Sequence, residues 1–171
     1  MIKQSNKIDL YVLKKNADTA RPSTNKFFKS IKKKSYADLD KAVHHLHEEV
    51  FTKINCLSCA NCCRSLGPRI AERDIEKLSK FLKIKSSVFI EKYLIMDEDS
   101  DYIFKSMPCP FLDNENYCMV YSERPKACRE YPHTDRRRFY QLLNITLNNT
   151  FICPAVYEIV EKLKKTLEFK F

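Results

Sequence analysis

Four of the chain's eight cysteines fall within eight consecutive residues, in the order C-x2-C-x2-C-C, as Cys56, Cys59, Cys62 and Cys63. The remaining four follow singly, as Cys109, Cys118, Cys128 and Cys153. Thiolates are the softest ligands among protein side chains, and thiols this close in sequence are expected to share metal. We therefore predict that all eight cysteines ligate metal and that the fold is built around the centre they form.

The spacing leaves two kinds of centre open. A dense cysteine run completed by a Cys-Pro is how bacterial ferredoxins hold iron–sulfur clusters, and both Cys109 and Cys153 precede a proline. Zinc also takes four cysteines, but zinc ribbons pair two C-x2-C knuckles, whereas the downstream cysteines here are isolated. The pattern favours an iron–sulfur cluster over zinc. The adjacent Cys62 and Cys63 could serve two different metals.

Disulfides are the competing interpretation of eight cysteines. The first ten residues, Met1–Leu10, contain no apolar run, so we do not expect a signal peptide. A cytoplasmic location is therefore predicted, and structural disulfides do not persist in that reducing compartment. The vicinal pair Cys62 and Cys63 is also poorly placed to form a bridge, because a disulfide needs a specific Cβ geometry.

Length and composition predict one compact, mainly α-helical domain, with several helices and a small β-hairpin around the cysteine-ligated metal. The chain has 171 residues, of which 44% are hydrophobic, enough for a core that does not depend on metal. We divide it into a Lys-rich N-terminal arm, 1–35, broken at Arg21-Pro22-Ser23, and a cysteine-cluster domain, 36–171. No stretch is long and apolar enough for a membrane span.

Apolar residues recur at helical spacing in several segments, and helices are expected at 36–54, 71–82, 87–94, 126–131, 139–147 and 154–167. Two β-prone runs, 102–107 and 117–121, predict the hairpin that carries Cys109 and Cys118. A serine at 86 or 87 is the expected cap of the third helix. Gly67, the only glycine, predicts a backbone conformation that other residues resist or a close approach to metal.

Other chemistry-bearing residues are few. Arg124 and Arg129 flank Cys128, where they could bind an anionic group or donate hydrogen bonds to thiolate sulfurs. His133 is a candidate ligand or proton carrier, although a structural role is also open. The three histidines of 36–54, at 44, 45 and 47, lie off the apolar stripe and predict an exposed surface. No catalytic residue can be assigned.

The formal charge of +9 suggests, as one hypothesis, that the protein binds nucleic acid. The lysines are spread along the chain, and metal-bound thiolates would cancel much of the excess. We expect basic residues near the cysteines, among them Arg64, Arg69 and Lys126, to balance thiolate charge, and we do not expect a nucleic-acid partner. A metal ion or cluster is the predicted partner, and a protein that binds the Lys-rich arm is a second candidate partner.

Several separated motifs in order resemble one family: C-x2-C-x2-C-C-R at 56–64, C-P-F-L at 109–112, C-x2-Y-x2-R-P-x2-C-R at 118–129, Y-P at 131–132 and C-P at 153–154. The chain resembles the CxxCxxCC cysteine-cluster proteins of the YkgJ type, described as zinc- or iron-chelating domains, over about residues 50–165. The resemblance implies a bacterial cytoplasmic protein that chelates iron or zinc.

Flagellin lysine methylases look similar over the cluster and carry an iron–sulfur centre, which adds weight to iron, but this chain shows no methyl-donor motif. We predict a metal-binding protein with a redox or accessory role. Two alternatives stay open. One is a metal-dependent enzyme, an oxidoreductase or a protein-modifying activity. The other is a structural zinc module whose basic arm binds a macromolecule.

Overall fold

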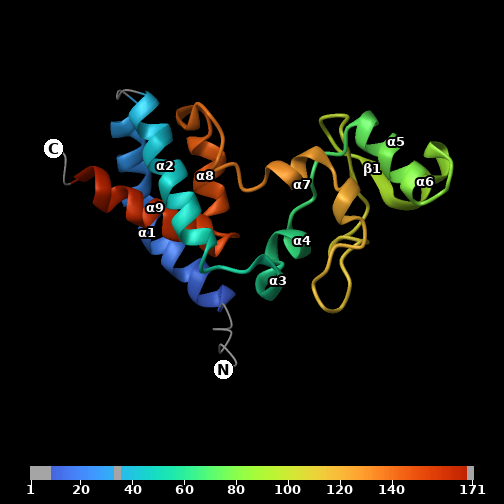
Figure 1. Ribbon diagram of the computed structural model, residues 1–171, viewed down its shortest axis with the longest axis horizontal. Coiled ribbons are helices and arrows are strands. Elements are labelled where there is room, and N and C mark those ends of the chain that lie inside the picture. Colours follow the sequence, from blue (N-terminus) through green and yellow to red (C-terminus); the bar gives the residue numbers. More distant parts are fainter. Residues whose placement is uncertain (1–8, 33–35, 169–171) are drawn as a thin grey trace. The chain divides into compact units, whose positions relative to one another are not determined.

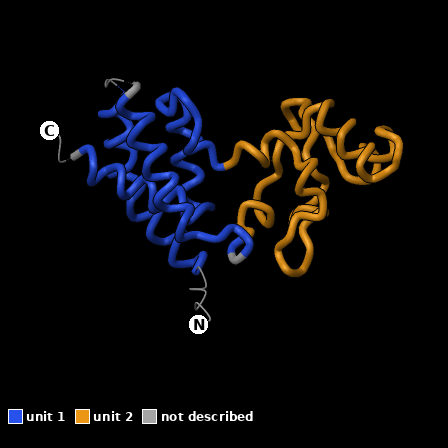
Figure 2. Tube along the Cα trace, viewed as in Figure 1, with its two compact units in different colours: residues 1–59, 132–171 blue, residues 60–131 orange. Residues whose placement is uncertain are grey.

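The computed structural model describes residues 9–32 and 36–168. These residues form two compact units (Figure 2). Unit 1 contains the chain up to Cys59 and again from Pro132, and unit 2 contains 60–131. The prediction of a mainly helical fold with a small antiparallel pair of strands is confirmed. The boundary proposed at residue 35 lies outside the described residues.

The secondary-structure elements of the described part of unit 1 are all helices or helical turns. Its elements are α1 (Leu10–Ile31), α2 (Tyr36–Phe51), α3 (Cys56–Cys59), the short 3-10 turn η2 (Phe139–Gln141), α8 (Leu143–Asn149) and α9 (Pro154–Glu168). Helix α9 packs against both α1 and α2 (Figure 1). The apolar residues that recur at helical spacing in 36–54 and 154–167 form the buried faces of α2 and α9, which comprise Leu39, Val43, Leu46, Val50, Val156, Ile159, Val160 and Leu163.

The break predicted at Pro22 is wrong, because α1 runs through this residue. An interior proline removes one backbone hydrogen bond and costs roughly 3 kcal/mol in a helix. Packing offsets this cost, since α1 buries Leu13 before the proline and Phe27 and Ile31 after it. Residues 10–31 therefore form a helix of the unit 1 core and not an irregular segment.

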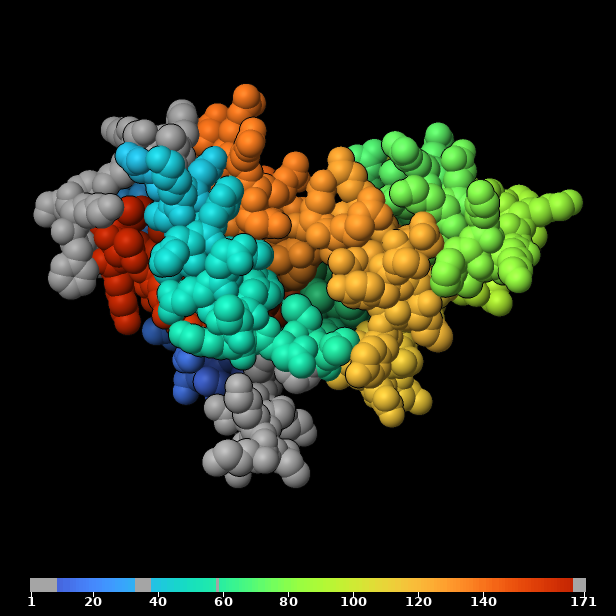
Figure 3. Space-filling view, viewed as in Figure 1, coloured from blue at the N-terminus to red at the C-terminus, as the bar shows by residue number. Residues whose placement is uncertain are grey.

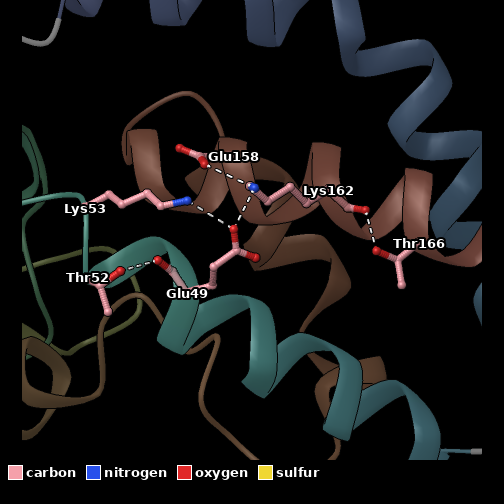
Figure 4. Close-up of polar contacts among 6 residues, drawn as sticks. All are labelled: Glu49, Thr52, Lys53, Glu158, Lys162 and Thr166. Carbon is pink, nitrogen blue, oxygen red and sulfur yellow. Dashed lines mark hydrogen bonds and ion pairs between the residues drawn. The ribbon is translucent and has the colours of Figure 1, made fainter.

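A polar cluster joins α2 to α9 (Figure 4). Lys162 Nζ donates to Glu49 Oε1 at 2.9 Å, and Lys53 Nζ donates to the same oxygen at 3.2 Å. The hydrogen bond from Lys162 is the main reason why the pKa of Glu49 is lowered. These groups are solvent-exposed, so their contribution to stability is small compared with that of the apolar core.

Asp40 anchors the return of the chain into unit 1. Its carboxylate accepts hydrogen bonds from the backbone N–H groups of Arg138, at 2.7 Å, and Phe139, at 2.9 Å. Arg138 has a left-handed backbone with φ of 58°, and the carboxylate holds the chain in this conformation where η2 begins. Phe139 is fully buried in the core as a result.

Unit 2 contains short elements. They are α4 (Asn61–Ser65), α5 (Glu72–Phe81), α6 (Ser86–Tyr93), β1 (Leu94–Met96), β2 (Tyr102–Phe104), the 3-10 turn η1 (Tyr121–Glu123) and α7 (Lys126–Glu130). Helices α5, α6 and α7 begin and end within one residue of the predicted limits, whereas α4 was not predicted. Its core consists of Ile70, Ile75, Leu78, Phe89, Leu94, Phe104, Phe111 and Val120.

The predicted pairing of the strands is wrong. Strand β2 pairs with β1, in the register Leu94 opposite Phe104, and not with 117–121. The acidic loop between them forms the turn, because the carboxylate of Asp97 accepts the N–H groups of Asp99 and Asp101. Near the cysteines only a single bridge, Leu112 to Cys118, remains of the predicted hairpin.

Three smaller expectations in unit 2 also fail. Phe81 and Val88 belong to the apolar residues at helical spacing in 71–82 and 87–94, but their side chains are 47% and 43% exposed. The cap of α6 is Lys85, and no side chain caps this helix. Gly67 does not have a positive φ, and a Cβ built on it would meet no atom within 4 Å, so the backbone here does not require glycine.

Within the described residues, none of the helices has the length and apolar character that a membrane crossing needs.

Candidate metal centre

The fold divides the eight cysteines between the two units. Unit 1 holds Cys56, Cys59 and Cys153, and unit 2 holds Cys62, Cys63, Cys109, Cys118 and Cys128. All eight have free thiols. The division falls inside the dense run, between Cys59 and Ala60, where Ala60 takes a left-handed backbone with φ of 47° and separates α3 from α4.

Backbone contacts bring the unit 2 cysteines together. The N–H of Cys109 donates to the carbonyl of Cys63 at 2.9 Å, which ties the 109–112 turn to α4. The bridge between Leu112 and Cys118 then sets Cys118 in the same region. Both Cys109 and Cys118 pack on the unit 2 core. Helix α7 carries Cys128, as the sequence predicted.

The thiols of Cys62 and Cys63 lie side by side on α4, with their Sγ atoms 3.9 Å apart. A hydrogen bond from Cys62 lowers the pKa of Cys63 to about 7, and the positive charges of Arg124 and Arg64 add to this effect. A thiol with such a pKa is about half ionised at neutral pH. Cys63 is thus the most readily ionised thiol among those of unit 2 whose pKa is shifted.

Three other thiols of unit 2 are held neutral. Burial raises the pKa of Cys109 to about 11 and that of Cys128 to about 12, and it also raises the pKa of Cys118. Neighbouring thiolates act in the same direction: Cys63 and Cys118 both raise the pKa of Cys109. Neighbouring thiolates repel one another because they have the same charge, and a bound cation offsets this repulsion and stabilises them all.

Arg124 supplies positive charge to this group. Its guanidinium lies over the ring of Tyr121, 3.8 Å from the ring centroid, and its charge opposes the raised pKa values of Cys118 and Cys128. Its Nε is buried and has no hydrogen-bond partner in the described structure. The sequence predicts a role for Arg124 beside the thiolates, whereas Tyr121, although it is part of the family motif, was expected in a strand and not as a partner of Arg124.

Arg129, Arg64 and Arg69 have separate roles. Arg129 donates a hydrogen bond to the backbone carbonyl of Arg124 at 2.5 Å and so supports the loop that contains Arg124. Arg64 hydrogen-bonds to Asn116. The expectation that Arg69 balances thiolate charge is not met, because its Nε pairs with Asp101 at 2.8 Å.

The unit 1 cysteines form a second group. Cys56 and Cys59 are the two ends of α3, and Cys56 is exposed (Figure 3 shows the turquoise segment around residue 55 on the visible surface). Cys153 precedes α9, and its N–H donates to Asn149 at 2.8 Å. Burial raises the pKa of Cys153 to about 11, and the charges of Cys56 and Cys59 raise it further.

The histidines lie in unit 1. His44 Nε2 is 3.1 Å from the carbonyl of Arg136, and His47 Nδ1 is 2.7 Å from Thr134 Oγ1. These contacts agree with a structural role for His44 and His47. Both are half-buried, so the predicted exposure is found only for His45. His133 is half-buried with φ of 70°. It belongs to unit 1, whereas Arg124 and Arg129 belong to unit 2.

The residues present fit a metal by the chemistry of their donors. Unit 2 offers five soft thiol donors, one of them with a lowered pKa, beside an arginine with a buried, unpaired N–H. The geometry is not that of a finished site. Among the side chains that the structure describes, no three His, Cys, Asp or Glu groups converge closely enough to hold a metal ion.

Comparison with known proteins bears on the same segment. The model of the CxxCxxCC family, described as a "putative zinc- or iron-chelating domain", matches residues 55–151. This range contains every cysteine except Cys153, which lies two residues beyond it. No curated protein and no solved structure gives a significant match. Since the matched range is more than half of the chain and includes the motif that names the family, the chain belongs to the CxxCxxCC family of zinc- or iron-chelating domains.

Proposed function

We propose that this protein binds iron through its cysteines, as an iron–sulfur centre, with zinc as the alternative occupant, and that it has a redox or accessory role. The observation that carries the proposal is the grouping of the thiols within each unit. The charges of Cys63, Cys109 and Cys118 all raise the pKa of Cys128, although these four residues are spread over more than sixty residues of sequence.

The proposed ligands of unit 2 are these four cysteines, with Cys62 as a fifth donor beside them. Four thiolates are the donor set that both iron–sulfur clusters and structural zinc use. The unit 1 group, Cys56, Cys59 and Cys153, is a second candidate centre with three thiols of its own. An iron–sulfur centre, when bound, would supply one-electron transfer.

The part of Arg124 in this proposal follows from its buried Nε. A guanidinium N–H directed at a thiolate sulfur lowers the electron density on that sulfur and offsets its charge, which raises the reduction potential of a cluster and orients the ligand. The stack on Tyr121 fixes the plane of the guanidinium, and the hydrogen bond from Arg129 fixes the backbone of the same residue.

The test is the absorption spectrum of protein purified without oxygen, with iron, zinc and acid-labile sulfide measured on the same sample. A brown protein with charge-transfer absorption, iron and sulfide supports the iron–sulfur centre. Colourless protein with stoichiometric zinc refutes the redox role and leaves a zinc-chelating domain.

The ligand assignment is tested separately by metal content. Cys118→Ser is expected to lose metal from the unit 2 group, because the hydroxyl of serine is a much poorer ligand for a soft cation. The control is Ser122→Ala, an exposed position on η1 four residues away. Equal metal content in both variants would show that Cys118 is not a ligand.

A further inference from the structure

A pocket in unit 2 is lined by positive charge and contains no cysteine. Its volume is about 440 Å³, and its walls are Ala71, Arg73, Asp74, Lys77, Lys126 and Arg129. Helix α5 supplies one wall and α7 the other. In the space-filling view the green segment around residue 75 and the orange segment around residue 126 come together at the surface (Figure 3).

The two cations of α5 are not used elsewhere in the fold. Arg73 and Lys77 are four residues apart, so they lie on the same face of the helix. Neither has an ion pair or a side-chain hydrogen bond with any residue that the structure describes. By contrast Arg69, four residues before Arg73, forms an ion pair with Asp101. Unpaired cations that share one concave wall are available to a ligand.

A buried carboxylate holds the two walls together. Asp74 is 4% exposed, and both of its oxygens lie 3.2 Å from the backbone nitrogen of Lys126, which donates to them. This contact fixes the start of α7 on α5. Lys126 and Arg129, three residues apart, then share one face of α7. Among the described residues Asp74 forms no ion pair with the cations that line the pocket, so it orders the two walls without pairing with these cations.

The charge of the pocket is positive even when its acids are counted. Four cations line it against the single carboxylate of Asp74, and Glu130, which does not line the pocket, lies 3.7 Å from Lys126, a largely exposed lysine. Arg129 uses one N–H on the carbonyl of Arg124 and keeps its remaining donors. Two arginine forks and two lysines fit an anion with two negative charges and several acceptor oxygens.

We infer that this pocket binds the phosphate group of a small phosphomonoester. The volume is that of a small-molecule site rather than of an extended macromolecular groove. The phosphate would sit between Arg73 and Lys77 of α5 and Arg129 of α7. The assignment goes beyond metal chelation and does not depend on which metal the cysteines hold, because none of the pocket residues is a proposed metal ligand.

The test is calorimetric titration of the full-length, metal-loaded protein with ribose 5-phosphate, with ribose as the uncharged control. Saturable binding of one ribose 5-phosphate per chain is expected. Arg73→Ala and Lys77→Ala should each weaken it about tenfold or more, because each removes charge-assisted hydrogen bonds to phosphate. Lys80→Ala, which removes the same charge from α5 outside the pocket, should change the Kd less than twofold.

Three results would overturn the inference. One is the absence of saturable binding. The second is equal weakening by Lys80→Ala and Lys77→Ala, which would mean attraction by the general positive field. The third is sedimentation of the protein with phosphatidic acid vesicles that depends on Arg73 and Lys77 while ribose 5-phosphate does not bind, which would assign the pocket to a lipid headgroup.

Discussion

Binding of metal to the unit 2 thiols must release protons, and the structure sets their number. At pH 7 the three thiols with raised pKa values, Cys109, Cys118 and Cys128, each carry a full proton. Cys63, with a pKa of about 7, carries about half of one. Ligation requires thiolates, so a metal bound by these four should release about three and a half protons at this pH.

The same number fixes how affinity depends on pH. Protons compete with the metal, so affinity rises with pH, and the logarithm of the association constant should change by about 3.5 per pH unit near neutrality. Between pH 6.5 and 7.5 this corresponds to roughly a 3,000-fold increase in affinity. Burial is the cause, because it is the largest effect that keeps the three thiols protonated.

The assay is zinc titration by calorimetry in buffers of different ionisation enthalpy, where the slope of observed against buffer enthalpy gives the protons released. A variant with Cys56, Cys59 and Cys153 replaced by serine restricts binding to the unit 2 group, and its circular dichroism reports whether it has folded. Adding Cys128→Ser should lower the slope by about one proton. A slope below two, or one that Cys128→Ser leaves unchanged, would refute the proposed ligand set.

Three further outcomes are expected. Asp40→Ala should lower the free energy of unfolding in urea by about 2–3 kcal/mol, because two backbone N–H groups lose a charged acceptor, whereas Asp38→Ala should change it little. Arg124→Gln should weaken metal binding about tenfold in a competition with a chelator, and Arg69→Gln should not. Contacts with lysines lower the pKa of Glu49 in the folded protein, so its ionised side chain stabilises the fold above the unfolded pKa. This stabilisation is lost as the pH falls through the lower folded pKa. Glu49→Gln should therefore destabilise the protein at pH 6 but not at pH 3, as measured by denaturation at both pH values.

The helices of this protein could be predicted because burial imposes a period on the sequence. Leu39, Val43, Leu46 and Val50 recur at the steps that place them on one face of α2, and this face is buried. Local rules failed where packing outweighs them. Pro22 is tolerated inside α1 because Leu13, Phe27 and other residues on both sides of it are buried in the core.

Strand pairing could not be predicted by propensity, because a β-prone run does not specify its partner. The turn at Asp97 brings β1 and β2 together as a pair. The sequence shows only that this segment is an acidic loop, and it does not indicate the hydrogen bonds that the carboxylate of Asp97 accepts. The cysteines of the candidate site could be found in the sequence, but their division between the two units could not. The C-x2-C-x2-C-C run suggests one cluster, whereas the left-handed backbone at Ala60 assigns its first two cysteines to unit 1 and its last two to unit 2.

The two units should respond differently to removal of metal. Among the described residues, the core of unit 1 contains fifteen buried hydrophobic residues and that of unit 2 contains eight, so unit 2 has less apolar burial to hold it. Unit 2 also contains five of the cysteines, and metal bound to them would add its binding free energy to the stability of the unit.

Chelation of the zinc-loaded protein by EDTA should therefore increase amide hydrogen exchange in α4 and α7 by at least tenfold while α2 and α9 stay protected. The contacts that hold α4 to Cys109 and α7 to Asp74 are few, and they are the contacts that bound metal would reinforce. Matched samples with and without chelator, compared peptide by peptide, measure the difference directly. Uniform loss of protection in both units would mean that metal holds the whole chain together, as in a structural zinc module. Unchanged exchange in unit 2 would mean that its thiols do not hold the metal.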